Sequence, residues 1–184
     1  MTIDIADVLA NHEFGPQEGD SRPLFVAIAG GSGSGKTTIA RSVVDLVGRD
    51  NVVYLQQDAY YRDQPDLSLE ERASTNYDHP DSIEMELLTE HLDALRVGSA
   101  IERPIYDFSR HERTAETYRL SPERAVIVEG ILVLADPELR KRFDVRVYID
   151  TEPDIRLMRR LERDIVERGR TVESVLDQYQ RTVR

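Results

Sequence analysis

Residues 24–38 read LFVAIAGGSGSGKTT, an apolar run that ends in a glycine-rich turn followed by one lysine and two threonines. Glycine permits backbone angles at which successive N–H groups converge on phosphate oxygens, and this stretch fits the spacing GxxxxGK(S/T) of such loops. The lysine would neutralise the outer phosphates, and the hydroxyl that follows suits Mg²⁺. A flexible Gly/Ser linker is the alternative, but a linker would not follow a buried strand directly. The expected phosphate-binding residues are Gly30, Gly31, Ser32, Gly33, Ser34, Gly35, Lys36, Thr37 and Thr38.

Length and composition predict one compact domain. The chain has 184 residues, of which 40% are hydrophobic, enough for a real core. Residues 1–22 end in a polar stretch and are expected to form a flexible N-terminal leader, with the folded domain over residues 23–184. The absence of cysteine excludes disulfides and thiolate metal sites, and the four histidines form no zinc pattern.

Charge and hydropathy indicate which classes of partner the protein can bind. The formal net charge of −11 repels polyanions, so we expect no nucleic-acid partner, although small phosphates can still bind locally. The N-terminus lacks the positive start and apolar stretch of a secretory signal, and no segment approaches membrane-spanning length. We therefore expect a cytoplasmic protein without a membrane partner.

Apolar runs alternate with helical patterns along the chain. Besides the first strand, we expect strands at residues 52–56, 125–130 and 145–149, and helices at 38–47, 67–73 and 83–97 and from Pro153 onward, broken at Gly169. Such alternation predicts an α/β fold, a doubly wound parallel sheet with helices on both faces. Residues 100–120 show β propensity around a polar turn and predict a small hairpin, interpreted as a substrate flap.

Two acids lie at the carboxyl ends of expected strands, where we expect them to face the phosphate loop. Asp58 comes just after residues 52–56, where the carboxyl ends of an α/β sheet lie, and could act as a base or merely cap a turn. Glu129 ends a buried strand and could hold Mg²⁺, or could simply be a polar strand terminus. Asp58 is the second acid expected near the metal.

Arginines and aromatic residues supply the other candidates. On a helical wheel, Arg156, Arg160 and Arg163 cluster opposite Ile155, Met158, Leu161 and Ile165. Residues 153–170 are therefore either a solvated face with i,i+4 ion pairs or, as we favour, an arginine-rich lid over phosphates. The aromatic residues of segments 60–61, 77 and 106–108 are either core packing or a pocket for a stacking ligand.

Taken in order, the segments GGSGSGKTT, QQDAYYRD, NYDHPDS, IYDFSRHER, VEGIL and RRLERDIVERGR, with the later QY, resemble the uridine kinases, also called uridine-cytidine kinases. The resemblance covers residues 24–184 almost throughout. It implies a P-loop NTPase-type fold and transfer of the γ-phosphoryl group of ATP or GTP, with Mg²⁺, to the 5′-hydroxyl of uridine or cytidine. The product would be UMP or CMP in pyrimidine salvage, and the enzyme a homotetramer.

The resemblance also implies roles for individual residues. The catalytic residues would be Asp58 as base, Lys36 and Arg163, and the metal residues Thr37, Glu129 and Asp58. Asp78 and Gln178 would contact the ribose, and His111 would read the exocyclic group of the pyrimidine. The full substrate-binding set is Tyr61, Tyr77, Asp78, Tyr106, Phe108, His111, Arg160, Arg168, Arg170 and Gln178.

The chain departs from the family pattern in a few places. Tyr77 stands where phenylalanine is usual, Ile83 and Glu84 replace an aromatic–acid pair, and Thr171 replaces an acid. The family continues past the QY segment into another strand and helix, so we expect that the chain ending at Arg184 is incomplete.

Two other functions stay open. A related P-loop kinase could phosphorylate another small alcohol, such as pantothenate or a sugar phosphate, and would need more basic residues near the YDF and NYDHP segments. The second possibility is a non-catalytic nucleotide-binding or switch module. A GTPase switch would need an NKxD motif to recognise the base, but the only lysines are Lys36 and Lys141, and neither lies in such a motif.

Overall fold

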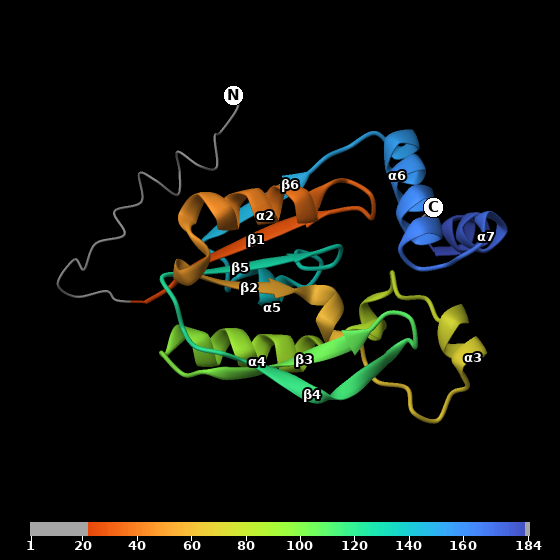
Figure 1. Ribbon diagram of the computed structural model, residues 1–184. Coiled ribbons are helices and arrows are strands. Elements are labelled where there is room, and N and C mark those ends of the chain that lie inside the picture. Colours follow the sequence, from red (N-terminus) through yellow and green to blue (C-terminus); the bar gives the residue numbers. More distant parts are fainter. Residues whose placement is uncertain (1–21, 183–184) are drawn as a thin grey trace.

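The computed structural model describes residues 22–182 and is built around a four-stranded parallel sheet (Figure 1). The strands are β1 (Leu24–Gly30), β2 (Val52–Gln56), β5 (Ala125–Gly130) and β6 (Val145–Ile149), in the order β2-β5-β1-β6. Every residue of β1 and β5 is buried, because these central strands are covered on both faces. The expected parallel sheet and its strand positions are confirmed.

Helices cover both faces of the sheet, as expected for a doubly wound fold (Figure 1). On one face, α2 (Lys36–Val47) packs Ala40, Val43 and Val44 against β1 and β5. On the other, α4 (Met85–Arg96) buries Leu88, Leu92 and Leu95 in a second apolar cluster. Burial of whole leucine side chains contributes roughly 1.5–3 kcal/mol each, so these two clusters hold the sheet rigid beneath its carboxyl edge.

Several short elements connect the longer strands and helices. They are the 3₁₀ turns η1 (Arg49–Asn51), η2 (Gln57–Tyr60) and η3 (Pro80–Ser82), and the short helices α3 (Leu69–Ser74) and α5 (Pro137–Arg140). A capping box begins α3, in which Ser68 and Glu71 satisfy each other's backbone N–H groups. The sequence did not predict α5, which is only one turn long and starts at Pro137 behind the capping carboxylate of Asp136.

The expected hairpin is present. It consists of β3 (Ile101–Asp107) and β4 (Glu112–Leu120), paired antiparallel with a register shift between Pro104 and Tyr106. Proline has no N–H to donate to the ladder, which suits a position beside such an irregularity. The hairpin packs against η2 and α4 rather than joining the parallel sheet.

The C-terminal part is helical and breaks at Gly169, as expected. Helices α6 (Pro153–Val166) and α7 (Val172–Thr182) pack together at the carboxyl end of the sheet (Figure 1). The solvated-face interpretation of the α6 arginines is wrong, because the Arg160 residue is only 4% exposed whereas Met158 is 57% exposed. The arginine side of α6 therefore faces the protein.

The expected N-terminal leader lies outside the described residues, except for Arg22. That guanidinium forms two hydrogen bonds, of 3.0 and 3.1 Å, with the carboxylate of Asp144. No helix within residues 22–182 has the length and apolar character needed to cross a membrane.

Candidate active site

The glycine-rich loop between β1 and α2 adopts the backbone that its sequence predicts. Gly33 and Gly35 have φ angles of +79° and +93°, which favour glycine. A Cβ atom on Gly31 would lie 2.3 Å from Arg156 Nη1, and one on Gly33 would lie 2.2 Å from the Arg156 carbonyl oxygen. Helix α6 thus closes directly onto the loop, and side chains are excluded there by both conformation and space.

Behind the loop, Glu129 receives a dense set of hydrogen bonds. Its Oε1 atom accepts from the Thr37 hydroxyl at 3.0 Å, the Tyr54 hydroxyl at 3.2 Å and Gln56 Nε2 at 3.3 Å. Burial and then the Glu129 carboxylate raise the pKa of Tyr54, so this phenol remains a proton donor. The buried Glu129 Oε2 atom has no hydrogen-bond partner.

This arrangement fits a magnesium ion with few protein ligands. Mg²⁺ keeps several waters and usually takes one or two protein oxygens together with substrate phosphates. The unpartnered carboxylate oxygen and the Thr37 hydroxyl supply such oxygens beside the loop. Within residues 22–182, no group of three or more histidine or acidic side chains forms an all-protein metal cage.

Asp58 lies in η2, immediately after β2, and lines a cavity together with Lys36. Its neighbour Gln57 is fully buried and accepts a hydrogen bond from the Leu132 backbone N–H at 2.9 Å. A Cβ atom on Gly130 would lie 2.4 Å from Gln57 Oε1, so β5 and η2 touch at this point. These contacts fix the backbone that carries Asp58.

Aromatic rings from three separate segments form one cluster. The Tyr61 ring meets Tyr77 edge to face at a centroid distance of 4.8 Å and Tyr106 at 5.3 Å. His111 stacks on Tyr77 at 5.4 Å with an interplanar angle of 21°, from a left-handed backbone with φ of +51°. The Tyr106 hydroxyl donates to the Tyr77 hydroxyl at 3.2 Å. The cluster thus offers ring faces and polar edges together.

Burial sets the protonation states of this cluster. Desolvation, followed by the charges of Arg170 and Arg168, lowers the pKa of His111, so its imidazole is neutral at pH 7. Desolvation also raises the pKa values of Tyr61 and Tyr106, the latter further through its bond to Tyr77. The aromatic side of the cavity is therefore uncharged.

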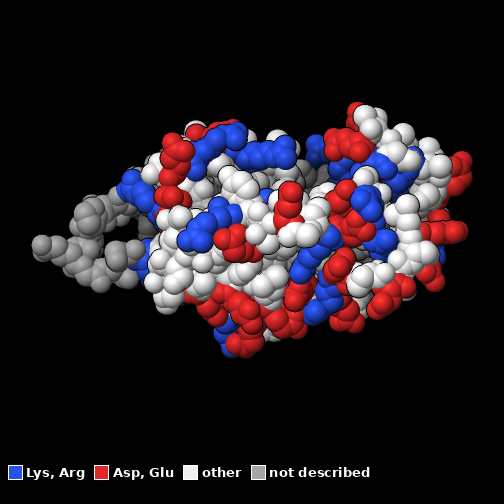
Figure 2. Space-filling view, turned by 60° about the horizontal axis from the view of Figure 1, so that its bottom comes forward, with Lys and Arg blue, Asp and Glu red and all other residues white. Residues whose placement is uncertain are grey.

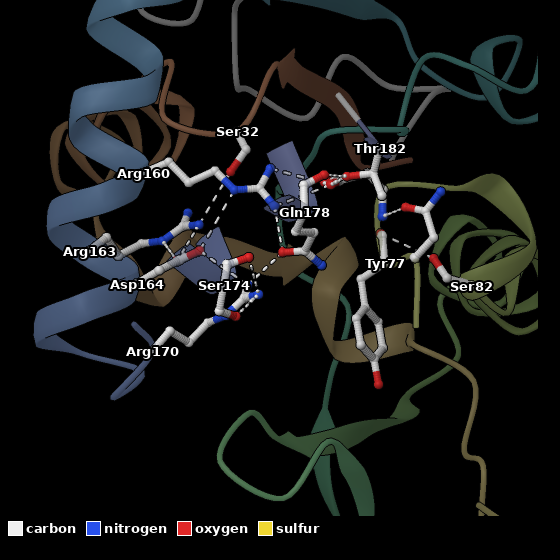
Figure 3. Close-up of polar contacts among 12 residues, drawn as sticks. Ser32, Tyr77, Ser82, Arg160, Arg163, Asp164, Arg170, Ser174, Gln178 and Thr182 are labelled. Carbon is white, nitrogen blue, oxygen red and sulfur yellow. Dashed lines mark hydrogen bonds and ion pairs between the residues drawn. The ribbon is translucent and has the colours of Figure 1, made fainter. Parts of the chain in front are cut away.

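Arginines of α6 and of the turn before α7 form the opposite wall (Figure 3). Arg160 donates to Asp78 Oδ2 at 3.3 Å and to Gln178 Oε1 at 2.9 Å. Arg170 also donates to Gln178 Oε1, at 2.5 Å, and Arg163 donates to the Ser32 hydroxyl of the loop at 3.3 Å. The wall thus reaches both the loop and α7.

The cavity joins the loop, the aromatic cluster and the arginine wall. The expected site residues that line it are Ser32, Lys36, Asp58, Tyr61, Tyr77, Asp78, Tyr106, Phe108, His111, Arg160, Arg163, Arg168, Arg170 and Gln178. Ala73, Ser109 and Ile131 line it as well. The expected residues outside this lining are Gly30, Gly31, Gly33, Ser34, Gly35, Thr37, Thr38 and Glu129, which belong to the loop and the sheet behind it.

Sequence reasoning missed three contributors to this site. Asp164 pairs with the arginine wall, Thr182 donates to Asp78 Oδ2 at 2.8 Å, and Gln57 anchors the backbone of Asp58. The spacing of Arg160 and Asp164 by four residues indicated one ion pair, but not that other arginines share the same carboxylate. Nothing in the sequence indicated the contact of Thr182, which lies 104 positions from its partner.

The model of the Phosphoribulokinase / Uridine kinase family matches residues 25–184. A uridine kinase of Clostridium perfringens is 49% identical over 163 residues, which are 89% of this chain and 78% of that protein. A uridine kinase of Halalkalibacterium halodurans is 50% identical over 163 residues, 89% of this chain and 77% of that protein. The solved phosphoribulokinase from Rhodobacter spheroides has a TM-score of 0.61 at 16% identity, covering 89% of this chain and 63% of that one, which shows a shared fold. The chain belongs to the Phosphoribulokinase / Uridine kinase family.

Proposed function

We propose that this protein is a uridine kinase that transfers the γ-phosphoryl group of ATP or GTP to the 5′-hydroxyl of uridine or cytidine. The observation that carries the proposal is a single cavity lined by Lys36 of the phosphate loop, by Asp58 and by an aromatic cluster. The uridine kinases of C. perfringens and H. halodurans, about half identical to this chain, support the same substrate class.

In this proposal, the loop and Lys36 hold the triphosphate, and Asp58 accepts the proton of the attacking hydroxyl. Thr37 and Glu129, with Asp58 nearby, would hold Mg²⁺, which would offset charge on the phosphates. Arg163 and the other wall arginines would stabilise charge on the phosphoryl group in flight. Residues 153–170 would act as a lid and residues 100–120 as a substrate flap over a kinase domain of residues 23–184.

The nucleoside would occupy the aromatic end of the cavity. Its base would stack among Tyr77, Tyr106 and Phe108, and its exocyclic group would meet the neutral imidazole of His111. Asp78 and Gln178 carry oxygen acceptors suited to ribose hydroxyls.

Finer points of the proposal follow from the family resemblance. They are a role in pyrimidine salvage, a cytoplasmic location, dependence on Mg²⁺ and a homotetrameric assembly. Figure 2 shows acidic and basic side chains intermixed over the face turned forward, where basic residues form no continuous band among the described residues. With a net charge of −11, this supports small phosphates rather than nucleic acid as partners.

A coupled assay of ADP release tests the proposal. The acceptor panel contains uridine, cytidine, the purine nucleosides, pantothenate and ribulose 5-phosphate, each with ATP and Mg²⁺. We expect ADP to be released when the acceptor is uridine or cytidine, and not with the other acceptors of the panel. ADP release only with pantothenate or ribulose 5-phosphate would indicate a kinase that acts on another small alcohol. No ADP release with any acceptor would support a non-catalytic nucleotide-binding module.

A further inference from the structure

One buried carboxylate, Asp164 of α6, pairs with all four arginines of the wall. Figure 3 shows it with Arg160, Arg163 and Arg170. Its oxygens lie 2.8 Å from Arg163, 3.5 Å from Arg168, 3.6 Å from Arg170 and 3.7 Å from Arg160. The Asp164 side chain is only 1% exposed, and its Oδ2 atom has no hydrogen-bond partner. Arg163 and Arg168 face its Oδ1 atom, and Arg160 and Arg170 face its Oδ2 atom. A buried carboxylate that faces four cations differs from an exposed surface ion pair, which contributes little to stability.

The charges around Asp164 are unbalanced. Four guanidinium groups share this carboxylate, and among the ion pairs of the described residues only Arg160 has a second partner, Asp78 at 3.3 Å. Like charges so close repel one another, and the pKa of Arg170 is lowered by burial and by Arg160 and Arg168. The surplus positive charge lines the cavity, where the proposed phosphoryl transfer would take place.

Asp164 also ties the turn before α7 to α6. The backbone N–H of Arg170 donates to the Asp164 carbonyl oxygen at 3.0 Å, across Gly169 with its φ of +62°. The carboxylate and the carbonyl of one residue therefore hold the guanidinium and the backbone of Arg170. This places two arginines of the turn beside two arginines of the helix.

We propose that Asp164 is a positioning residue that assembles Arg160, Arg163, Arg168 and Arg170 into one cationic wall before phosphates bind. It contacts the arginines and does not line the cavity, so it would act through them. A wall arranged in advance needs no reorganisation when charge develops on the phosphoryl group. The inference deepens the proposed function and rests on it for the identity of the phosphoryl acceptor.

The test compares Asp164→Asn with the unmodified protein. Asparagine keeps the shape and one oxygen acceptor but removes the charge that offsets repulsion among the arginines. We expect kcat with ATP and the best acceptor to fall about 10- to 100-fold, the range found for residues that orient the ligands of a metal site. We also expect tripolyphosphate, measured by calorimetry without nucleoside, to bind at least about fivefold more weakly, although the site has gained a positive charge.

Two controls separate positioning from general damage. Glu162→Gln removes an equal charge from an exposed position of the same helix, and should leave kcat and tripolyphosphate affinity unchanged. Thermal melting shows whether Asp164→Asn folds. If it does not, Asp164→Glu retains the charge but displaces it by one methylene, and we expect a folded protein with reduced kcat and tripolyphosphate affinity.

The outcomes are distinct from those of the acceptor panel. Unchanged kcat, or tripolyphosphate affinity equal to or tighter than that of the unmodified protein, would overturn the role of Asp164. If the unmodified protein phosphorylates neither uridine nor cytidine, the proposed function fails, while the tripolyphosphate measurement still decides whether Asp164 assembles an anion-binding wall.

Discussion

The phosphate loop and the proposed nucleoside pocket are built in opposite ways. The loop is one continuous segment between β1 and α2, and its shape follows from glycine backbone angles. The pocket joins segments far apart in sequence: Asp78 bonds to Arg160, 82 positions away, and to Thr182, 104 positions away. A single substitution that changes the local backbone can therefore disrupt the loop. The pocket depends on several long-range contacts, so each substitution there should have a smaller effect.

The largest effect is expected where the two regions meet, at Asp58. Asp58→Asn removes the proposed proton acceptor while keeping shape, so turnover should fall about 10²- to 10⁴-fold with ATP affinity retained. Steady-state kinetics and ATP titration measure the two quantities. Asp66→Asn, an exposed acid in the same connection, should be neutral. Near-normal turnover of Asp58→Asn would remove the residue from the role of base.

The substitution Gly33→Ala should disrupt the phosphate loop without changing the pocket. The new Cβ would meet the Arg156 carbonyl oxygen at 2.2 Å on a backbone with φ of +79°, so ATP affinity should fall on the order of 10- to 100-fold. Gly98→Ala is the matched control, because its φ is +82° and its Cβ would meet nothing within 4 Å. An ATP affinity of Gly33→Ala equal to that of Gly98→Ala would contradict the role of the Gly33 conformation and of its contact with α6 in ATP binding.

A smaller effect is expected on the pocket side, from Tyr77→Phe. In the structure, the Tyr106 hydroxyl hydrogen is engaged with Tyr77, which leaves Tyr106 oxygen lone pairs for a ligand donor such as the amino group of cytidine. Removing the Tyr77 hydroxyl frees Tyr106 to donate, so the kcat/KM ratio of uridine to cytidine should rise about fivefold. Tyr118→Phe, on the exposed strand β4, is the control. An unchanged ratio in Tyr77→Phe contradicts the hydroxyl pair as a specificity element.

The smallest effect concerns the neutral imidazole in that pocket. Since the pKa of His111 is lower in the folded state than the ordinary value of 6.5, the unfolded chain binds more protons as pH falls through this range. The free energy of unfolding should therefore decrease below about pH 6.5 and approach a constant contribution above it. Arg72, Arg168 and Arg170 deepen the shift, and Asp107 opposes it.

Denaturant unfolding at several pH values measures this dependence. The variant His111→Gln should show a shallower decrease than the unmodified protein. His91, whose pKa is also lowered by burial, should retain its own contribution in that variant. Identical pH profiles for the two proteins would contradict the assignment to His111.

The contrast between loop and pocket also explains what the sequence could predict. Strands β2, β5 and β6 occupy the expected residues. The continuous apolar run of β5 is buried on both faces, whereas the edge strand β6 alternates half-buried and exposed residues, and both patterns predict strands. Helix bounds moved by one or two residues, as at α2 and α4, since helix ends depend on local hydrogen bonds. The one-turn helix α5 is too short for any periodicity to reveal.

In the candidate site, residues in motifs were predictable and residues that support them were not. Asp58 and Glu129 could be found from their positions just after β2 and at the end of β5, because parallel strands bring their carboxyl ends to one edge. The shared partners of Asp164 and the contact of Thr182 with Asp78 depend on how α6 and α7 pack, which no spacing in the sequence encodes. The sequence favoured a lid of arginines over a solvated face, but only the structure decided between these two interpretations.

The left-handed backbone of His111 has a consequence for engineering. Glycine or asparagine occupies such a conformation more easily than histidine, so replacing His111 is expected to relax the hairpin tip and gain thermal stability. The same replacement would delete the ring that lies against Tyr77. At this position, selection for thermal stability and selection for substrate discrimination should therefore favour different residues.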